Sequence, residues 1–484
     1  MRAHFVGVCG TGMGSLATLF RDAGHVVTGS DARFDPPMGE VLAAAGVVCL
    51  PGFDAARLDP APDLVVVGNA IRRDNVEAAF AVERELRRTS MSLALREYFL
   101  SRRRPLVVTG THGKTTTSSM CAWILSRADR GPGYFIGGVS KNLPASAAIG
   151  LAAKSLTSPR DLPFVIEGDE YDAVYWDKKP KFLDYVGVGK DDVVILTGIE
   201  HDHVDIYPTE GEYEEAFLSL VSRIPSGGLL VCDAKETLAR RVAHAARCKV
   251  AFYALEGDET GDATPSWVGA PAKVDEQHMQ PFDFYAGGVA CGRAVMPVSG
   301  AHNVRNALAA IAACAEGFGV DIRAAKAALS TFKGVRRRQD LLGTPGGIRV
   351  YDDFAHHPTA VNETLRALRA KHPTDSLWAV FEPRSATACR ALHQDAYARA
   401  FGDATRVILA PLGRSRVPEA ERLDLPRLAR DIGAKAEAAA SSEAVLDRLL
   451  TGARAGDTVA LLSNGAFDGL PSRLLEALSR RARV

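Results

Sequence analysis

The sequence has no long apolar run and no excess of charge of either sign. No segment contains the roughly 18 consecutive apolar residues that suggest a membrane-spanning helix. The 58 Lys and Arg residues balance 58 Asp and Glu residues, whereas a general nucleic-acid binder normally carries a basic excess. We therefore expect neither a membrane nor a nucleic acid as a partner. A neutral total does not exclude a local basic pocket for a small anion.

Paired cysteines and a leader segment are also missing. The eight cysteines are scattered, with no C-x-x-C spacing, which predicts reduced and mostly buried thiols rather than a disulfide framework. The first residues pass into a glycine-rich turn and lack the apolar core of about 7–15 residues that marks a signal peptide. We therefore expect a cytoplasmic protein.

The alternation of short β-branched runs with helical patterns predicts the fold class. Examples of the runs are residues 4–8, 106–109 and 378–381, and examples of the helical patterns are residues 115–128 and 303–317. This alternation is typical of α/β units with mainly parallel sheets. A chain of 484 residues suggests about three domains of about 150 residues each.

Two basic stretches mark the predicted domain boundaries. Residues 101–105 precede a new strand, and residues 331–338 lie between a helix and another strand. Within the middle domain, residues 257–281 are polar and turn-rich, which indicates an irregular sheet excursion. We predict domains at residues 1–103, 104–332 and 333–484.

A glycine-rich turn between a strand and a helix is the strongest motif. It reads G-x-x-G-K-T from Gly110 to Thr115, with Val108 where the full phosphate-loop pattern has its first glycine. In such a loop, backbone N–H groups hold phosphates, Lys114 reaches the β- and γ-phosphates, and the Thr115 hydroxyl binds Mg²⁺. The strand before and the helix after favour this interpretation over a chance G-K-T.

Four other segments carry polar groups that are ambiguous when taken alone. Four carboxylates follow the strand at residues 164–166, and they suit Mg²⁺ or form a solvated acidic turn. His203 is a ligand or a structural histidine. Asn303 and Asn306 share a helix face and bind a base or cap the helix. The run at residues 336–338 binds phosphate or is merely a solvated basic run.

The amino-terminal turn resembles a dinucleotide fingerprint. Gly10 and Gly12 follow a strand and Asp31 follows the next one, but Ser15 stands where the third glycine is required. An NAD-dependent oxidoreductase is therefore an alternative, although it leaves the Lys114 loop unexplained. A nucleotide-sensing module without turnover is another, which the acidic strand end and His203 disfavour.

Taken together, these segments resemble the Mur ligase family, the ATP-dependent enzymes that build peptidoglycan stem peptides. The phosphate loop is similar to its T-G-T-x-G-K-T-[ST]. Later segments match E-x-D-E-[SY]-D from Glu167, G-x-H-N-x-x-N-A-L-A-A from Gly300, R-R-x-[ED] from Arg336 and D-D-[FY]-x-H-H-P from Asp352. The segment around His203 resembles N-x-x-x-D-H-x-D, with Gly198 in place of the Asn. The motifs occur in the family's order across essentially the whole chain.

The resemblance implies a three-domain Mur ligase architecture. A Rossmann-like N-terminal domain would bind the UDP-sugar, a P-loop ATPase-like central domain would bind ATP and Mg²⁺, and a Rossmann-like C-terminal domain would close over ATP and bind the amine substrate. Lys114, His203 and Arg338 would be the catalytic residues, with Arg338 at the γ-phosphate. The asparagines would contact adenine and Asp353 the ribose.

The implied site residues fall into three sets. The ATP-binding set is Gly110, Thr111, His112, Gly113, Lys114, Thr115, Thr116, Asn303, Asn306, Arg338 and Asp353. The metal ligands are Thr115, Glu167 and His203, with His203 on a second Mg²⁺. The UDP-sugar set is Gly10, Thr11, Gly12, Met13, Asp31 and Asn69.

The choice of amine substrate depends on short differences between two members that act on UDP-N-acetylmuramate. One adds L-alanine, and the other adds the recycled tripeptide L-alanyl-γ-D-glutamyl-meso-diaminopimelate. This chain has F-E-P-R-S at residues 381–385 where the L-alanine enzyme typically has F-Q-P-H-R, and S-N-G-A-F-D-G at residues 463–469, which is similar to the tripeptide enzyme. Residues 171–178 also resemble that enzyme. Residues 216–218 contain no lysine, in contrast to the family members that carry a carbamylated lysine there.

The resemblance therefore implies a tripeptide ligase, with the L-alanine ligase as the alternative. The peptide-binding residues would be Glu382, Arg384, Ser385 and Asn464, because Arg384 offers a bidentate partner for a carboxylate. The reaction would pass through an acyl phosphate, and His201, His356 and His357 are the candidates for deprotonating the amine. The expected partners are these small-molecule substrates, with the chain a monomer or weak homodimer.

Overall fold

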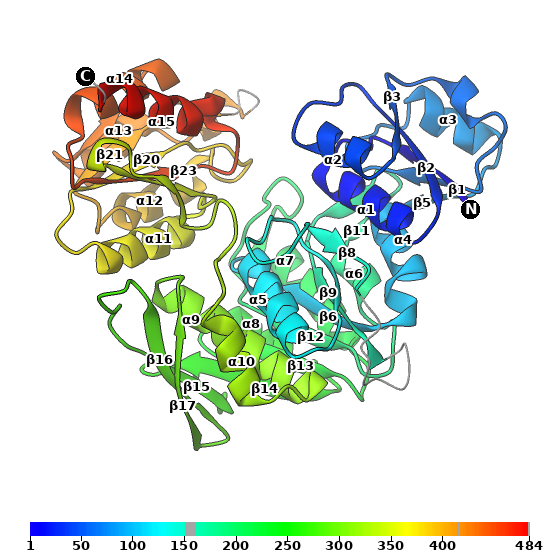
Figure 1. Cartoon of the computed structure of the whole chain (residues 1–484), viewed down its shortest axis with the longest axis horizontal. Helices are drawn as coiled ribbons and strands as arrows, with labels where there is room; N and C mark the ends of the chain where they lie inside the picture. Colours follow the sequence, from blue (N-terminus) through cyan, green and yellow to red (C-terminus); the bar gives the residue numbers. More distant parts are fainter. Residues whose placement is uncertain (151–160, 414–416, 483–484) are drawn as a thin grey trace.

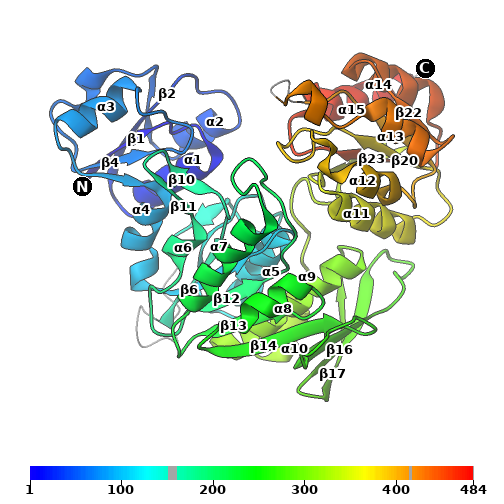
Figure 2. The same ribbon diagram turned by 180° about the vertical axis from the view of Figure 1, so that it is seen from behind.

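Three α/β units make up the chain in this computed structural model, which describes residues 1–150, 161–413 and 417–482. The N-terminal and C-terminal units lie apart at the two upper corners of the molecule, and the central unit below joins them (Figures 1 and 2). This arrangement confirms the predicted α/β class and three-unit organisation. None of the described helices is both long and apolar enough to cross a membrane.

The N-terminal unit is a five-stranded sheet in the order β3-β2-β1-β4-β5, and every pair is parallel. From β1 the chain continues towards one edge of the sheet, and from β4 it continues towards the other edge. Open α/β sheets bind ligands in the crevice between two such strands. The strands are β1 Arg2–Val6, β2 Val26–Asp31, β3 Val48–Pro51, β4 Leu64–Val67 and β5 Arg88–Ser90, and the helices are α1 Thr11–Asp22, α2 Met38–Ala44, α3 Val76–Glu83 and α4 Met91–Tyr98.

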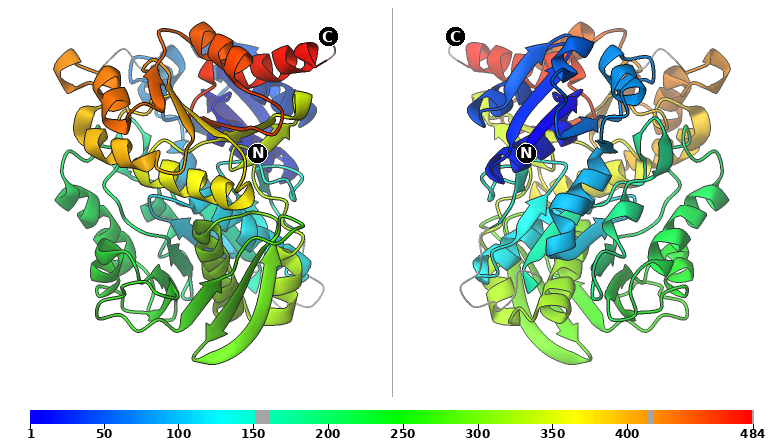
Figure 3. Two further views of the ribbon diagram at one scale, coloured as in Figure 1. Left: turned by 90° about the vertical axis from the view of Figure 1, so that its left-hand side faces the viewer. Right: turned by 90° about the vertical axis from the view of Figure 1, so that its right-hand side faces the viewer.

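The central unit is built on a ten-stranded sheet in the order β17-β16-β15-β14-β13-β12-β6-β9-β7-β8. The strands from β15 to β7 are parallel, whereas β16, β17 and β8 pair antiparallel. The strands are β6 Arg104–Thr109, β7 Gly133–Phe135, β8 Ala147–Ala148, β9 Pro163–Glu167, β12 Val193–Leu196, β13 Leu229–Asp233, β14 Lys249–Leu255, β15 Trp267–Pro271, β16 Gln280–Ala286 and β17 Val289–Met296. The antiparallel extension lies at the lower end of the molecule in Figures 1 and 3.

The helices of the central unit carry most of the predicted nucleotide motifs at their N-terminal ends. They are α5 Lys114–Arg127, α6 Phe182–Tyr185, α7 Glu210–Ser222, α8 Thr237–Ala243, α9 Ala301–Ala312 and α10 Ile322–Leu329. A separate hairpin pairs β10 Asp172–Val174 with β11 Asp177–Pro180. The Lys114 loop and the Asn303 segment therefore both lie at the start of a helix.

The C-terminal unit is a six-stranded sheet in the order β18-β19-β23-β20-β21-β22. Only its edge strand β18 is antiparallel to its neighbour. The strands are β18 Asp340–Gly343, β19 Arg349–Asp353, β20 Leu377–Phe381, β21 Arg406–Leu409, β22 Ala436–Ala438 and β23 Thr458–Leu462, and the helices are α11 Pro358–Lys371, α12 Gln394–Ala400, α13 Leu425–Ile432, α14 Ser442–Gly452 and α15 Leu470–Arg481.

Three predictions about local structure need correction. The first strand is Arg2–Val6 rather than residues 4–8. The helix predicted to end at residue 317 is α-helical only to Ala312 and continues as a π-helical turn, Ala313–Gly317. The stretch at residues 257–281 contains a regular strand, β15. Four of the eight cysteines are buried and the other four are only partly buried, whereas we predicted mostly buried thiols.

The fully buried carboxylate of Glu77 joins helix α3 to strands β1 and β2. Its Oε1 accepts a hydrogen bond from the Asp54 backbone N–H at 2.9 Å, and its Oε2 accepts one from the Ser30 hydroxyl and lies 3.3 Å from His4 Nε2. Burial alone would raise its pKa, but these hydrogen bonds lower the pKa of Glu77 overall. The ionised carboxylate therefore stabilises this unit.

We expect Glu77→Gln to lower the free energy of unfolding by about 1–3 kcal/mol at neutral pH, because a buried hydrogen-bonded charge is lost. Since the folded-state pKa is depressed, the stabilisation is present above the ordinary glutamate pKa of 4.5 and is lost as the pH falls through the folded value. Denaturant unfolding at several pH values should show the difference between the proteins shrinking below about pH 4.5. Glu97→Gln, at an exposed pair with Arg87, is the control, and equal effects of the two substitutions would contradict the account.

Candidate active site

The glycine-rich loop after β6 has the backbone that a phosphate loop requires. Gly110 and Gly113 have φ values of +120° and +79°, a conformation that favours glycine. The Thr111 N–H donates to the Gly198 carbonyl at 2.9 Å, so the end of β12 holds the loop. Gly198, which replaces the family Asn, thus contacts the loop through its backbone. The loop presents the N-terminus of the 14-residue helix α5 to any bound anion.

Lys114 is held inside this loop by an ion pair. Its Nζ lies 2.6 Å from the Gly110 carbonyl oxygen and 3.0 Å from Glu170 Oε2. Burial lowers the pKa of Lys114, but Glu170, Asp169 and Glu167 outweigh burial and raise it. The ammonium group is therefore charged at neutral pH and available for phosphate.

Glu170 is the buried centre of the site, and sequence reasoning noted it only as one of four carboxylates that suit Mg²⁺. It accepts from Lys114 and lies 3.0 Å from His203 Nε2 through its Oε1. Burial would raise the pKa of Glu170, yet the two cationic partners lower it to about 2. The sequence does mark Glu170, because it is the second Glu of the E-x-D-E motif. Its position between Lys114 and His203 depends on the tertiary fold.

Thr115 and Glu167 form a set of oxygen donors beside the loop. The Thr115 hydroxyl donates to Glu167 Oε1 at 2.7 Å, and the Gly137 N–H donates to Oε2 at 2.7 Å. Burial and the nearby Asp169 raise the pKa of Glu167, so a cation would favour its ionised form. Hard oxygen donors such as these fit Mg²⁺. His203 contacts Glu170 rather than Glu167.

One of the two predicted asparagines, Asn306, meets the phosphate loop. Asn303 and Asn306 are buried in the first turns of α9, and the Asn303 amide donates to the Ser299 carbonyl at 2.8 Å. A Cβ atom built on Gly113 would lie 2.4 Å from Asn306 Oδ1. Asn306 therefore packs directly on the loop.

We expect Gly113→Ala to lower the free energy of unfolding by about 1–2 kcal/mol through its left-handed backbone and to weaken ATP binding by displacing Asn306. Gly257→Ala is a matched control, because Gly257 has a φ of +85° and nothing within 4 Å of the built Cβ. Calorimetric titration with ATP should separate the two variants. Equal ATP affinity in both would show that the packing of Asn306 is unimportant.

The linker at residues 332–339 and the end of β19 bring the C-terminal unit to this site. The Arg338 guanidinium lies 4.9 Å from the centre of the Phe354 ring, and within the described chain no carboxylate forms an ion pair with it. Arg337 instead donates to the Ser463 and Gly465 carbonyls. Asp353 is buried and accepts from the Gln339 and Ala355 N–H groups at 2.7 and 2.8 Å.

The three histidines considered for proton transfer have different surroundings. His201 Nε2 lies 2.8 Å from the Tyr207 carbonyl oxygen, which must accept its proton. His356 Nε2 lies 3.8 Å from Asp202. His357 is buried, and burial followed by the nearby His112 lowers its pKa to about 3. His357 is therefore neutral at physiological pH.

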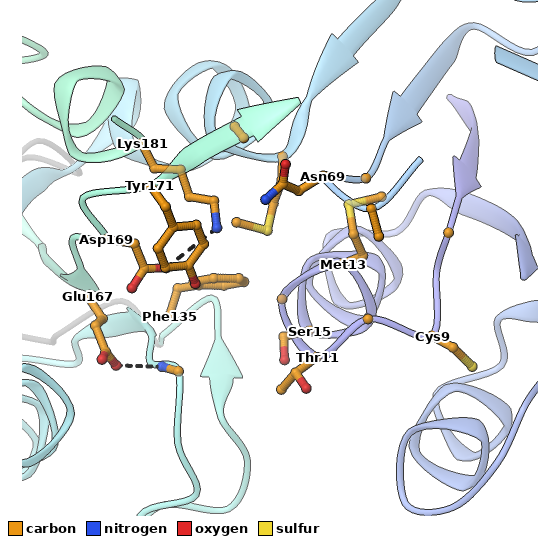
Figure 4. A pocket seen from close by; sticks show the side chains of 18 of the residues that line it. Cys9, Thr11, Met13, Ser15, Asn69, Phe135, Glu167, Asp169, Tyr171 and Lys181 are labelled. Carbon is orange, nitrogen blue, oxygen red and sulfur yellow. Dashed lines mark hydrogen bonds and ion pairs between the residues drawn. The ribbon is translucent and has the colours of Figure 1, made fainter. Parts of the chain in front are cut away.

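A pocket of about 600 Å³ lies between the N-terminal and central units (Figure 4). All six residues predicted to bind the UDP-sugar line it: Gly10, Thr11, Gly12, Met13, Asp31 and Asn69. The opposite wall contains Glu167, and Thr11 begins the 12-residue helix α1, whose N-terminus suits a pyrophosphate. The pocket thus runs from the N-terminal turn to the predicted metal ligands.

Sequence reasoning gave no role to Lys181, a central-unit residue of this wall. Lys181 lies with its Nζ 3.8 Å from the centre of the Tyr171 ring and 3.5 Å from Asp169 (Figure 4). Lys181 is nearly buried, so it supplies a cation inside the pocket. The residues next to Lys181 in the sequence are also charged or apolar, so the sequence does not distinguish Lys181 from them. Its place in the pocket depends on the fold.

The predicted peptide-binding residues lie at the ends of β20 and β23. Arg384 lies between Gly413 and Gly465. A Cβ atom placed on these two glycines would lie 2.7 and 2.0 Å from the Arg384 side chain, so a larger residue at either position would collide with it. Its Nη1 is 3.3 Å from Glu382 Oε1, and Asn464 has a buried Oδ1 without a hydrogen-bond partner. The Ser385 hydroxyl accepts a hydrogen bond from the Ala388 N–H at 2.9 Å. None of these residues lines the 600 Å³ pocket.

Three family models match the chain in order. They are the Mur ligase family catalytic domain at residues 2–103, the Mur ligase middle domain at residues 108–314 and the Mur ligase glutamate ligase domain at residues 337–465. The chain is also 35% identical over 485 residues to an Escherichia coli protein named UDP-N-acetylmuramate–L-alanyl-γ-D-glutamyl-meso-2,6-diaminoheptandioate ligase, with 100% of both chains covered.

The chain belongs to the Mur ligase family. A crystal structure of a murein peptide ligase from Psychrobacter arcticus superposes with a TM-score of 0.71 at 36% identity, covering 99% of each chain. A Roseiflexus protein named UDP-N-acetylmuramate–L-alanine ligase is 34% identical over 489 residues, covering 97% of each. The family consists of ATP-dependent, Mg²⁺-using ligases that form amide bonds, so this chain is such a ligase. The oxidoreductase interpretation of the N-terminal turn is therefore wrong.

Proposed function

We propose that this Mur ligase joins UDP-N-acetylmuramate to the tripeptide L-alanyl-γ-D-glutamyl-meso-diaminopimelate. The observation that carries the choice of amine is the polar cluster of Glu382, Arg384 and Asn464 in the C-terminal unit. It offers a cation, an anion and an amide, which suit the zwitterionic end of diaminopimelate. L-Alanine has no group distant from its reacting amine that needs such a cluster. The name of the Escherichia coli relative supports the same substrate.

The pocket beside the N-terminal turn is our proposed site for the UDP-sugar. The pyrophosphate would lie at the start of α1 near Gly10–Gly12, and Asp31 and Asn69 would contact the nucleoside end. Asp31 Oδ2 already accepts from the Cys9 N–H at 2.8 Å, so its carboxylate is fixed in place. The muramate end would point towards the Glu167 side of the pocket. Residues 1–103 would thus hold the sugar nucleotide.

ATP would bind between the central and C-terminal units. Its phosphates would lie on the loop from Gly110 to Thr116, its adenine at Asn303 and Asn306, and its ribose at Asp353. Thr115 and Glu167 would hold one Mg²⁺ and His203 a second, and a bound Mg²⁺ withdraws charge from phosphate oxygens. Residues 104–332 would therefore form the ATP domain, and residues 333–484 would close over it.

The first chemical step requires two anions to approach each other. A lactyl carboxylate oxygen attacks the γ-phosphorus, the bond to the β-phosphate oxygen breaks, and ADP leaves an acyl phosphate. Lys114 and Arg338 would neutralise the charge that accumulates on the γ-phosphate oxygens. Lys114 would then exchange its contact with Glu170 for the phosphate.

In the second step the L-alanyl amine attacks the acyl carbon. The tetrahedral adduct expels inorganic phosphate, and the amine loses one proton to a base. The Arg384 cluster is in the C-terminal unit, whereas the 600 Å³ pocket is lined by the other two units. Domain closure would therefore bring the amine to the acyl phosphate and exclude the water that hydrolyses it.

A steady-state comparison of amine substrates tests this proposal. Purified protein with ATP, Mg²⁺ and UDP-N-acetylmuramate should release ADP with a much higher kcat/KM for the tripeptide than for L-alanine. Comparable use of free L-alanine would instead identify the L-alanine ligase. The lysine-containing tripeptide tests recognition of the third residue.

A further inference from the structure

Three polar side chains converge where the phosphate loop meets the C-terminal unit. They are His112 in the loop, Glu200 in the segment after β12, and His357 immediately before α11. The nearest ligand atoms of the three residues all lie within 4.8 Å of one another. His112 Nε2 is 2.6 Å and His357 Nδ1 is 3.5 Å from the same oxygen, Glu200 Oε2.

His357 is a buried polar group that faces this cluster without a hydrogen bond. It is only 6% exposed, and neither of its ring nitrogens makes a hydrogen bond within the described structure. Its ring centre is 4.9 Å from that of His112. Burying an imidazole without partners costs free energy, so the position favours a ligand that the ring can bind.

The chemistry of the cluster selects the class of ligand. A neutral imidazole nitrogen binds a metal directly, and His357 is kept neutral by burial. Glu200 supplies a carboxylate, because its hydrogen bond from His112 overcomes the effect of burial and lowers its pKa to about 2. Two imidazoles and one carboxylate suit Zn²⁺ and similar ions, with water as a fourth ligand. Mg²⁺ prefers oxygen ligands, so the cluster differs in kind from the Thr115–Glu167 set.

The distances are compatible with such an ion after small side-chain shifts. Ligand bonds of about 2.0–2.2 Å to Zn²⁺ place tetrahedral ligand atoms roughly 3–4 Å apart. The Glu200 carboxylate is also fixed by the Thr359 hydroxyl, which donates to Oε1 at 2.8 Å. Thr359 belongs to α11, so Glu200 is oriented from both sides of the domain junction.

We propose that His112, Glu200 and His357 form a binding site for a divalent transition-metal ion of the Zn²⁺ type. The ion joins the phosphate loop of the central unit to the N-terminal end of α11 in the C-terminal unit. The site is separate from the Mg²⁺ ligands and does not depend on which amine the ligase uses.

Metal binding to the full-length protein tests this proposal directly. Chelator-treated protein in excess Mg²⁺ is titrated with Zn²⁺ against a chromophoric chelator, and with Co²⁺ while its visible absorption is recorded. We expect one Zn²⁺ equivalent and the intense Co²⁺ bands of a four-coordinate site. Glu200→Gln and His357→Ala, which lie in different units, should each weaken binding at least ten-fold.

Two further variants separate this cluster from other histidine sites. His203→Ala removes the histidine of the Mg²⁺ set and should retain the Zn²⁺ equivalent, as should His244→Gln, which alters an exposed His–Asp pair. Circular dichroism checks that each variant is folded. Unchanged Zn²⁺ affinity in both folded Glu200→Gln and His357→Ala, or loss of the equivalent in His203→Ala alone, would overturn the proposal.

Discussion

Replacing Lys114 with alanine is expected to lower the rate of substrate-dependent ADP release by about 10²–10³-fold, the usual cost of removing one preorganised group that stabilises transition-state charge. The reason is its location: Nζ is anchored by the Gly110 carbonyl within the loop and neutralised by Glu170. This cation is therefore already positioned before phosphate arrives. The measurement is a coupled assay of ADP with UDP-N-acetylmuramate and the tripeptide.

Lys249→Ala is the matched control for this substitution. Lys249 also pairs with a glutamate, Glu316, at 2.8 Å, but its side chain is 69% exposed and lies away from the loop. It should retain normal turnover. Because Lys114→Ala leaves the buried Glu170 with only His203 as an ionic partner, thermal unfolding must show that the variant is folded. Normal ADP release by folded Lys114→Ala would refute the phosphate-loop assignment.

Replacing Arg384 with alanine is expected to lower kcat/KM for the tripeptide by about 10–100-fold. The reason is that the variant loses a charge-assisted hydrogen bond to the peptide, which contributes about 1.5–3 kcal/mol. The two flanking glycines leave space for the side chain, and Glu382 orients it. The slow reaction with L-alanine should change little, since L-alanine has no distal carboxylate to pair with Arg384. The defect should therefore be specific to the peptide.

Arg427→Ala controls for the loss of an arginine in the same unit, because Arg427 pairs with Asp395 on the exposed face of α13. It should leave both reactions unchanged. If Arg384→Ala lowered tripeptide and L-alanine turnover equally, Arg384 would act in the common chemistry or in folding rather than in peptide recognition. The measurement is the ratio of the two kcat/KM values in each variant.

The parts of the site that could be predicted are those encoded over short distances along the chain. The residues from Val108 to Thr115 specify the end of a strand, a turn and the start of a helix, and the structure has these elements at those positions. The six predicted UDP-sugar residues lie on one pocket because the carboxyl ends of parallel strands meet at one edge of a sheet.

The parts that could not be predicted depend on contacts between distant segments. Glu170 was visible in the acidic motif, but its pairing with both Lys114 and His203 is set by where β9 and the segment after β12 end. Lys181 reaches the pocket only because the β10–β11 hairpin returns the chain there. The contacts of Glu200 with His112 and Thr359 span two units, so no local pattern could have shown them.

Isotope transfer tests the central claim most directly. UDP-N-acetylmuramate labelled with ¹⁸O in both oxygens of the lactyl carboxylate is incubated with the protein, ATP, Mg²⁺ and equimolar tripeptide and L-alanine, and the products are analysed by mass spectrometry. An acyl phosphate leaves one carboxylate oxygen on phosphorus, so the account predicts inorganic phosphate with one ¹⁸O and the muramyl tripeptide as the main amide. Unlabelled phosphate, or a product that contains mainly L-alanine, would contradict it.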